Sequence, residues 1–336
     1  MTNLLITSCG GLTSYNLIYL IKKKTKFKNL RIHITDKKKN VKAKLFSDSF
    51  TSLPDTKNKN YFKSIMKIVN NKQIKVIIPG SDEEAEFFSK KKKYFSKKNI
   101  FINVSDYSSY KKFISKDRFY RELKHYKIMS AKEWSLINNK KDLVSKINNF
   151  IKKKIDFVLK PSKARGGRNV YIFEKNLKKQ FSKNFNREKH IPFLRLEKYK
   201  LKYLKVNFPM VIMRKLYEPS FDIDILCFKG KLIKHVTRQR IGAQGIKGNI
   251  IKRNNLKFEK LSKRIAKIFN LTGLYDLDVM LNKKKNPVVI ELNPRISGSL
   301  SSSIQAGYNL IDDFISLTLG KKISTNKVAK DILIRR

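Results

Sequence analysis

The chain has 336 residues, of which 77 are Lys or Arg and 26 are Asp or Glu, so its formal net charge is +51. Because 41% of the residues are hydrophobic and 11% are aromatic, the chain can bury a sizeable core, and a wholly disordered basic protein is excluded. The length predicts two or three lobes. Only two cysteines, Cys9 and Cys227, are present, so a disulfide framework is also excluded.

The charge excess comes almost entirely from lysine, with 62 Lys and 15 Arg. Arginine grips phosphate oxygens in pairs, so a surface selected for nucleic acid should use it more heavily. We therefore interpret most of the lysines as solvated surface and keep a polyanion partner as the alternative.

Neither secretion nor membrane insertion is predicted. The stretch 4–21 is apolar, but no basic segment precedes it and Thr, Ser, Gly and Asn residues interrupt it. No other stretch approaches the ~20 apolar residues of a membrane helix. We expect a soluble cytoplasmic protein with no membrane partner.

The first hundred residues alternate between strand and helix patterns in the order of a parallel α/β unit. Strands are predicted at 4–7, 31–35 and 74–78, with a helix at 13–21. This order predicts a doubly wound, Rossmann-like sheet whose ligands bind at the carboxyl ends of its strands. The turn Cys9-Gly10-Gly11 lacks the full G-x-G-x-x-G pattern, so we favour a loop facing a substrate cleft over a dinucleotide site.

The pattern changes near residue 105, and a helix is predicted at 116–125. A loop is predicted within 176–200, and the tail after Lys321 is predicted to be weakly ordered. Further strands are predicted at 157–160, 169–173, 210–216, 221–228, 231–237, 274–281 and 287–292, and helices at 255–270 and 309–319.

One lysine ends an apolar strand. A charge at the position of Lys160 is costly unless an anion neutralises it. The Gly-rich segment 164–169 follows, and its backbone amides could wrap phosphates, although a solvent-exposed hairpin turn explains the same pattern.

The most informative stretch is Glu291-Leu292-Asn293-Pro294-Arg295. Strand side chains two residues apart share a face, so Glu291 and Asn293 should point to one spot. The turn at 282–286 should bring Asp278 of the preceding strand opposite Glu291, to within about one residue. These oxygens suit a hard cation such as Mg²⁺, whereas the alternative makes Asp276 and Asp278 exposed residues of a two-faced strand.

The order of these motifs resembles the ATP-grasp superfamily, in the branch related to the carbamoyl-phosphate synthase large chain and biotin carboxylase. The resemblance spans nearly the whole chain. It is carried by Pro79-Gly80-Ser81-Asp82-Glu83-Glu84, Asp117-Arg118, Leu159-Lys160-Pro161 with Gly166-Gly167, Phe221-Asp222-Ile223-Asp224, and Ile290-Glu291-Leu292-Asn293-Pro294-Arg295 with Ser297-Gly298-Ser299.

The resemblance implies an α/β chain with α+β lobes, in which a Rossmann-like pre-ATP-grasp domain precedes a two-lobed ATP-grasp domain. The implied boundaries are 1–112 for the first domain, 113–320 for the ATP-grasp domain, about 125–200 for its lid lobe, about 205–320 for its C-terminal lobe, and 321–336 for a basic tail.

The resemblance also implies roles for individual residues, with ATP and Mg²⁺ as cofactors and Mn²⁺ as an alternative ion. Arg295 and Lys160 would be catalytic, and Asp278, Glu291 and Asn293 would hold the metal. The nucleotide would meet Arg118, Lys160, Gly166, Gly167, Met213, Arg214, Lys215, Leu216 and Ser220. The substrate would meet Gly10, Gly11, Asp82, Glu83, Arg238, Arg240, Ser297 and Gly298.

Three positions depart from the family pattern. Arg118 replaces a common lysine, and Ser220 stands where an acid usually contacts ribose, with Glu218 two residues earlier. The hinge carries Arg214 and Lys215, which leaves its backbone rather than its side chains to contact adenine.

The implied function is an ATP-dependent ligase that activates a small carboxylate as an acylphosphate and couples it to an amine. A carbamoyl-phosphate-type reaction through carboxyphosphate is the alternative within this class. A nucleic-acid-binding protein is the alternative of another class, because Gly245-Ile246-Lys247-Gly248 matches the G-x-x-G loop of KH domains. The expected partners are small molecules, and a homodimer is left open.

Overall fold

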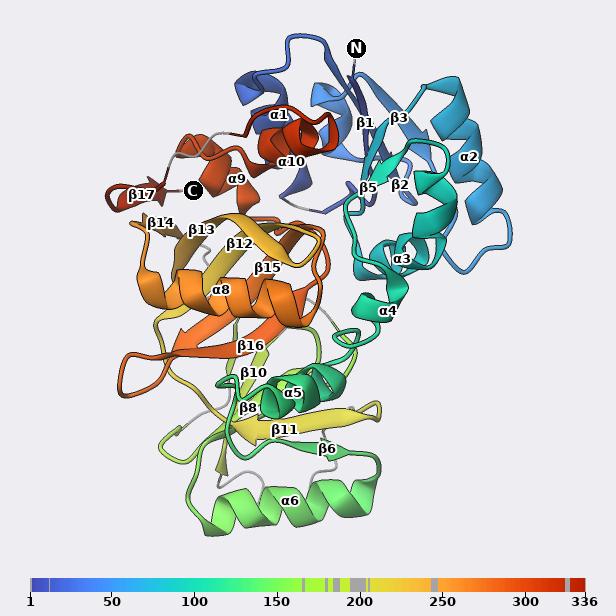
Figure 1. Cartoon of the computed structure of the whole chain (residues 1–336). Helices are drawn as coiled ribbons and strands as arrows, with labels where there is room; N and C mark the ends of the chain where they lie inside the picture. Colours follow the sequence, from blue (N-terminus) through green and yellow to red (C-terminus); the bar gives the residue numbers. More distant parts are fainter. Residues whose placement is uncertain are drawn as a thin grey trace.

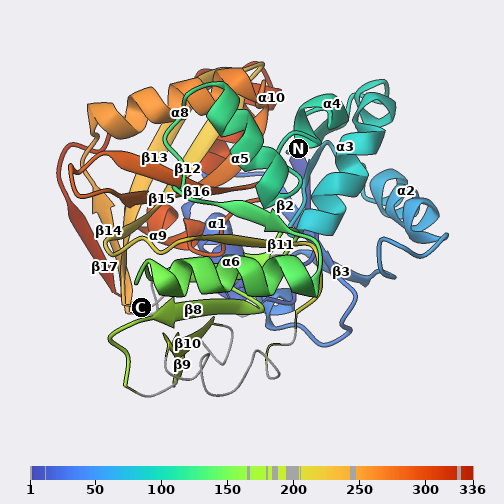
Figure 2. The ribbon, with the colours of Figure 1, turned by 90° about the horizontal axis from the view of Figure 1, so that it is seen from below.

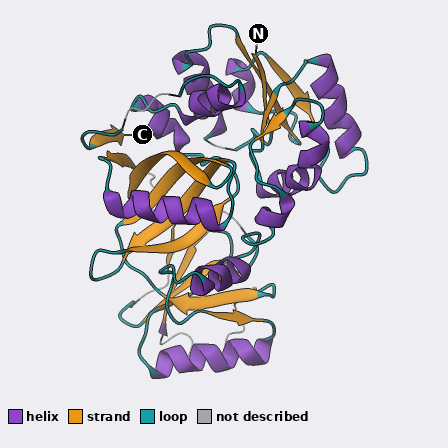
Figure 3. Ribbon diagram, viewed as in Figure 1, coloured by secondary structure: helices purple, strands orange, loops and turns teal. Residues whose placement is uncertain are grey.

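The computed structural model describes residues 2–11, 13–164, 167–178, 181–183, 188–193, 204, 206–242, 247–323 and 327–335. These residues form three β-sheets with helices packed against them, as Figures 1 and 3 show. In the view of Figure 1 the N-terminal sheet and the second sheet lie at opposite ends, and the third sheet lies between them.

The N-terminal sheet is parallel, with strand order β3-β2-β1-β4-β5. Its order reverses between β1 and β4, the kind of switch point where such sheets bind ligands. Leu4, Leu5 and Ile6 are all buried, as expected for a strand covered on both faces. The strands are β1 (Thr2–Ile6), β2 (Leu30–Asp36), β3 (Ser49–Ser52), β4 (Val76–Ile78) and β5 (Phe101–Ile102), and the helices are α1 (Ser14–Lys24), η1 (Lys42–Phe46), α2 (Tyr61–Asn71), α3 (Asp82–Ser96) and α4 (Tyr107–Tyr110).

The second sheet has the order β6-β11-β7-β8-β10-β9 and lies against helix α6, as Figure 2 shows. Leu143, Ile147 and Phe150 of α6 are buried against it. Its elements are β6 (Ser135–Ile137), α6 (Lys140–Lys152), β7 (Phe157–Pro161), β8 (Val170–Glu174), β9 (Phe181–Lys183), β10 (Glu188–Pro192) and β11 (Met210–Arg214). Because β11 pairs with β6 and β7, this lobe extends to Arg214, beyond the boundary expected between 200 and 205.

The third sheet is antiparallel, with the order β16-β15-β12-β13-β14-β17, and α8 lies across one of its faces (Figure 1). Its elements are β12 (Ser220–Phe228), β13 (Lys231–Ile241), β14 (Gly248–Lys252), α8 (Leu256–Ile268), β15 (Gly273–Leu281), β16 (Pro287–Asn293), α9 (Leu300–Gln305), α10 (Leu310–Thr318) and β17 (Ile332–Arg335); α5 (Lys116–His125) precedes the second sheet.

The expectation of a weakly ordered tail is wrong for its last described residues. β17 pairs with β14 over four positions, and Val328 and Ile334 are buried. The sequence contains an apolar Ile-Leu-Ile run at 332–334, but so short a run among basic residues did not predict a strand.

The N-terminal and third sheets share hydrophobic cores, and most of the second sheet has its own, although Val211 and Met213 of β11 belong to a core of the larger body. Ile18 of α1 belongs to one buried cluster with Leu226 and Phe314, while Phe157 and Phe173 belong to a separate cluster within the second sheet. The second sheet is therefore a lobe attached to a larger packed body.

The α/β fold with a Rossmann-like first domain is confirmed, and the predicted strands of the third sheet are present. Of the segment proposed as a KH loop, Gly245 and Ile246 lie outside the described residues, and Gly248 begins β14 inside the sheet. No helix within the described ranges is long and apolar enough to cross a membrane.

Candidate active site

The predicted pairing of the two acidic strands is confirmed. Asp278 of β15 lies opposite Glu291 of β16, and Asp276 lies opposite Asn293. The turn that joins the strands is closed by the Asn282 amide, which donates to the Asn286 carbonyl at 3.0 Å. Asp276 is only 4% exposed, so the alternative of an exposed two-faced strand is wrong.

Glu291 has a cationic partner that the sequence did not reveal. The Lys116 Nζ atom lies 2.9 Å from Glu291 Oε1 and donates to the Ala164 carbonyl at 2.7 Å. Burial opposes ionisation of Glu291, yet Lys116 and Lys160 together hold its pKa below the usual range. Lys116 therefore connects the segment after β7 to the predicted metal-binding acid.

Arg118, by contrast, does not reach this site. Its side chain is exposed and donates to the Lys111 carbonyl at 3.5 Å. Arg118 lies two residues beyond Lys116 on α5, and residues two apart do not share a helix face. The prediction chose the wrong cation because the family pattern favoured the residue directly after Asp117.

Lys160 is buried at the end of β7, and its Nζ donates to the Tyr120 hydroxyl at 3.1 Å. Tyr120 in turn donates to the Ile290 carbonyl at 2.7 Å, directly before Glu291. Burial lowers the pKa of the Lys160 ammonium, while Glu291 and Asp278 oppose that shift. Two lysines from different elements thus converge beside Glu291 and can receive the phosphates of a nucleotide.

A Tyr120→Phe variant is expected to raise the KM for ATP about tenfold with a smaller change in kcat. The variant removes the oxygen that holds both Lys160 and the Ile290 carbonyl, and a hydrogen bond to a charged group contributes about 1.5–3 kcal/mol. Steady-state ADP release over a range of ATP concentrations gives the KM for ATP and kcat separately. An unchanged KM for ATP would show that Tyr120 does not position Lys160.

The donor set beside Glu291 fits a hard divalent cation. Asp278 and Glu291 offer carboxylate oxygens, and Asn293 directs its Nδ2 to Asp276 at 3.3 Å, which leaves its Oδ1 for a ligand. Burial raises the pKa of Asp278 to about 7, with Asp222 and Glu291 adding to the rise and Arg240 opposing it. A cation here would stabilise the ionised form of that carboxyl group.

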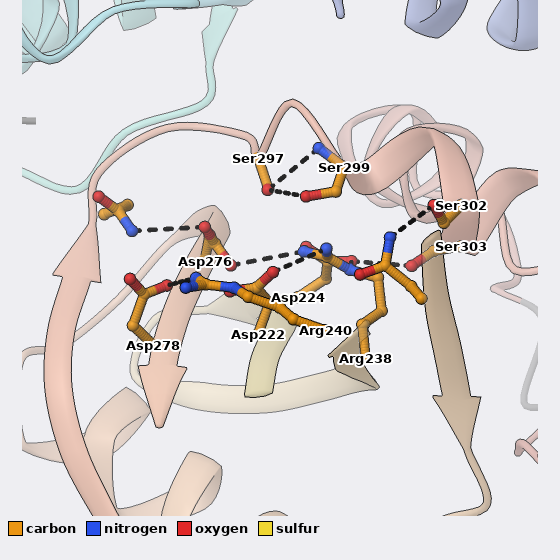
Figure 4. A network of polar contacts seen from close by, with 12 residues as sticks. Asp222, Asp224, Arg238, Arg240, Asp276, Asp278, Ser297, Ser299, Ser302 and Ser303 are labelled. Carbon is orange, nitrogen blue, oxygen red and sulfur yellow. Dashed lines mark hydrogen bonds and ion pairs between the residues drawn. The ribbon is translucent and has the colours of Figure 1, made fainter. Parts of the chain in front are cut away.

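The two arginines predicted to meet substrate are bound to aspartates instead, as Figure 4 shows. Arg238 is fully buried and donates to Asp222 at 3.0 Å and to both oxygens of Asp224 at 2.8 Å. Arg240 contacts Asp222 and lies 3.0 Å from Asp278. All the nitrogens of the Arg238 guanidinium are thus engaged, so its predicted substrate role is wrong: it holds the aspartates in place.

The predicted hinge residues lie at the end of β11 and directly after it. The Met213 Sδ atom lies 3.6 Å from the Tyr120 hydroxyl, and Arg214 pairs with Glu133 at 2.9 Å. Lys215 pairs with Glu174, and Leu216 follows it toward β12.

Ser220 and Glu218, the two residues considered for ribose contact, lie in contact with each other. The Ser220 amide donates to Glu218 Oε2 at 2.7 Å, so these two residues form one polar unit at the start of β12. In the Gly-rich loop, Gly167 has a positive φ of 70°, which glycine adopts without strain, whereas Gly166 lies outside the described residues.

A cavity of about 800 Å³ lies at the carboxyl ends of β1 to β4 and continues to the segment after β16. This volume suits a small-molecule ligand. Predicted substrate residues on its wall are Gly10, Gly11, Glu83, Ser297 and Gly298, and Arg295, predicted to be catalytic, also lines it. Asp82 does not line this cavity but holds Arg295, whose Nε lies 3.2 Å from Asp82 Oδ1.

The glycine turn is not available to a dinucleotide. The Gly10 amide, which a pyrophosphate would need, donates to Asp36 Oδ2 at 2.6 Å. A side chain at Gly10 would collide with that carboxylate, because an added Cβ would lie 2.7 Å from it. The turn therefore forms a wall of the cavity, as favoured over a cofactor site.

Two family models match the chain. Residues 4–103 match the family described as "PylC-like, N-terminal domain". Residues 207–336 match the family described as "ATP-grasp in the biosynthetic pathway with Ter operon". A search of curated protein sequences found no match.

Solved structures with the same fold include three ligases. N5-carboxyaminoimidazole synthase from Aspergillus clavatus, solved with ADP and 5-aminoimidazole ribonucleotide, has a TM-score of 0.69 at 14% identity, covering 98% of this chain and 80% of that one. L-amino acid ligase from Bacillus licheniformis has a TM-score of 0.65 at 13% identity, covering 97% of this chain and 76% of that one. Biotin carboxylase from Campylobacter jejuni has a TM-score of 0.65 at 14% identity, covering 96% of this chain and 72% of that one.

These structural likenesses establish the fold over nearly the whole chain, and the two family matches fall on its first and last parts. Residues 207–336 therefore match an ATP-grasp family, residues 4–103 match a PylC-like N-terminal domain, and nearly the whole chain has the fold of these solved ligases.

Proposed function

We propose that this protein is an ATP- and Mg²⁺-dependent ligase that joins a small carboxylic acid to an amine. The observation that carries the proposal is the convergence of Lys116 and Lys160 on Glu291, close to a cavity bordered by Arg295. Phosphoryl transfer needs this combination of fixed positive charge and positioning more than a covalent nucleophile.

The reaction has two steps. An oxygen of the acid attacks the γ-phosphorus of ATP, the bond to the bridging oxygen breaks, and ADP leaves with that electron pair. The amine nitrogen then attacks the acyl carbon, phosphate leaves, and the nitrogen loses a proton. Lys160 and Lys116 neutralise negative charge at the phosphates, and Arg295, held by Asp82, orients the carboxylate.

Asp278, Glu291 and Asn293 would hold the metal ion, which neutralises phosphate charge when it is bound. Adenine would lie beside 213–216, with Gly167 and Lys160 over the phosphates and the Ser220–Glu218 pair near the ribose. L-amino acid ligase among the structural neighbours supports a small organic acid as substrate. The cavity of about 800 Å³ has room for such an acid together with its amine.

The test is ADP release across a panel of amino acids and other small carboxylates, each with hydroxylamine as the amine. Hydroxylamine traps an acylphosphate as a hydroxamate, so the acid and the intermediate are identified together. The expected result is ADP release that depends on one class of acid and matches hydroxamate formation. ATP turnover that no acid stimulates, or tight RNA binding without turnover, would contradict the proposal.

A further inference from the structure

A buried glutamate lines the cavity at the carboxyl ends of β1 to β4 and has no part in the reaction described above. Glu84 lies in the first turn of α3 and is only 5% exposed. It nevertheless borders the cavity of about 800 Å³ in which the acid and the amine would meet. A titratable group in this place is able to touch a substrate, so its surroundings decide what it does there.

Capping of the helix does not account for the Glu84 carboxylate. In a capping box the glutamate side chain would bond back to the amide of the serine three residues earlier. The Glu84 amide does donate to Ser81 Oγ, at 3.3 Å. The carboxylate, however, has other partners among the described residues: it accepts from Thr7 Oγ1 at 2.6 Å, the Tyr61 hydroxyl at 3.0 Å and Ser81 Oγ at 3.2 Å. Its oxygens therefore lie beside the end of β1, at the cavity, rather than over the end of the helix.

These hydroxyl groups give their protons to Glu84. Thr7 Oγ1 accepts from the Gly80 amide at 3.4 Å, and Ser81 Oγ accepts from the Glu84 amide, so each hydroxyl points its own proton at the carboxylate. A carboxyl group that only accepts hydrogen bonds is in its ionised form. Burial raises the pKa of Glu84, while the neighbouring hydroxyls oppose that rise. Glu84 is thus an ionised group that takes up a proton more readily than a surface glutamate does, as a general base must.

No cation of the protein neutralises Glu84. Its hydrogen-bond partners in the described ranges are hydroxyl groups, and no lysine or arginine there forms an ion pair with it. The basic residues on the cavity wall are Lys37, Lys38, Lys57 and Arg168, which are exposed, and Arg295, which Asp82 holds. A buried carboxylate without a cation favours a cationic ligand. An amine substrate is such a ligand, because aliphatic amines are protonated at neutral pH.

Glu84 lies close to the end of the cavity that would hold the acid. Asp82, in the same first turn of α3, has its Oδ1 atom 3.2 Å from the Arg295 Nε atom. The segment that follows β1 makes a second connection, since it begins beside Glu84 and packs against Gly298. A Cβ added at Gly298 would lie 2.3 Å from Thr13 Oγ1. An amine at Glu84 and an acid at Arg295 would therefore be neighbours.

We propose that Glu84 binds the amine substrate as its ammonium ion and accepts a proton from it. This inference rests on the ligase function proposed above and names the substrate class as a basic amine. The ammonium nitrogen passes one proton to the Glu84 carboxylate, and the neutral nitrogen attacks the acyl carbon. The bond from that carbon to the phosphate oxygen breaks, its electron pair leaves with phosphate, and phosphate takes the second nitrogen proton. The products are the amide, inorganic phosphate and a protonated Glu84, which returns its proton to water.

The test compares two kinds of nucleophile with the acid that yields most hydroxamate. Hydroxylamine is a weak base and is largely neutral at the assay pH, so it needs no proton acceptor and reports acylphosphate formation alone. The basic probes are free amino acids, short alkyl diamines and ammonium. Glu84→Gln should lower amide formation from an accepted amine by about 10²-fold and leave hydroxamate formation within about twofold.

The matched control is Glu86→Gln, on the same helix but outside the cavity. Glu86 pairs with Lys90 and Lys163, whose side chains are exposed. Its ratio of amide to hydroxamate should stay within about twofold of the wild-type ratio, because such pairs contribute little. Thermal unfolding of each variant shows whether it is folded. Should Glu84→Gln not fold, Glu84→Asp decides by the same ratio, since it withdraws the carboxylate from the cavity by roughly 1.5 Å, the length of one C–C bond.

Equal losses of amide and hydroxamate in the Glu84 variant would make Glu84 a structural residue and overturn the proposal. An unchanged ratio would do the same. Loss of hydroxamate with an amino acid, but not with the same acid lacking its amino group, would assign Glu84 to the acid substrate instead. A wild-type protein that forms hydroxamate but couples none of the basic probes would overturn this inference and leave acid activation standing. Absence of hydroxamate with every acid would contradict the ligase proposal itself, and this inference with it.

Discussion

A Glu291→Gln variant should release ADP at least about 10³-fold more slowly than the wild-type protein at saturating substrates, a loss of ~4 kcal/mol in transition-state stabilisation. Glutamine keeps the size of the side chain but removes the charge that pairs with Lys116 and offers a ligand to the metal. The two lysines at the site would then lack their common carboxylate. Single-turnover ADP release with excess enzyme measures the chemical step directly.

The matched control is Glu259→Gln on α8, where the glutamate pairs with the exposed Lys263 on the helix surface. This change should leave the rate within about twofold, because exposed ion pairs of this kind contribute little. Both proteins should unfold at similar temperatures. If Glu291→Gln retained wild-type activity while remaining folded, the metal and phosphate site would have to lie elsewhere.

The sequence predicted the acidic hairpin well because its physics is local. Side chains alternate with a period of two on a strand, and a short turn fixes the register, so the pairing of Asp278 with Glu291 followed from spacing alone. The strand-turn order of the first domain was equally readable, and it placed the cavity at the carboxyl ends of the strands.

The roles of Lys116 and Arg238 were missed because they depend on contacts between segments that lie far apart in the sequence. Lys116 approaches Glu291 across 175 positions of sequence, and only the packing of α5 against β16 brings them together. Arg238 could not be recognised as buried because its three aspartate partners lie on two other strands. The spacing of residues in the sequence predicts which side chains share a face of a strand. It does not predict which oppositely charged residue, far away in the sequence, will pair with them.

The net charge of +51 says little about this site. Four aspartates lie together in Figure 4, in a chain with about three basic residues for each acidic one: Asp222, Asp224, Asp276 and Asp278. Acids are scarce here, so four of them in one buried group are more informative than the surface lysines. The long-range positive field still favours the approach of anionic nucleotides and acids.

Arg238→Met should destabilise the protein by about 3–5 kcal/mol, measured in EDTA by chemical denaturation. Methionine fills a similar volume but removes the guanidinium that Asp222, Asp224 and Asp276 share. Asp224 would keep its hydrogen bond from Ser303 Oγ at 2.8 Å, and Asp222 would keep Arg240, but neither replaces the lost charge. The effect should therefore appear in stability rather than as a selective change in substrate KM.

The control is Arg31→Met, since Arg31 is exposed on β2 and should change stability by no more than about 0.5 kcal/mol. An Arg238→Met protein as stable as the control, with a raised substrate KM, would restore Arg238 to the substrate site.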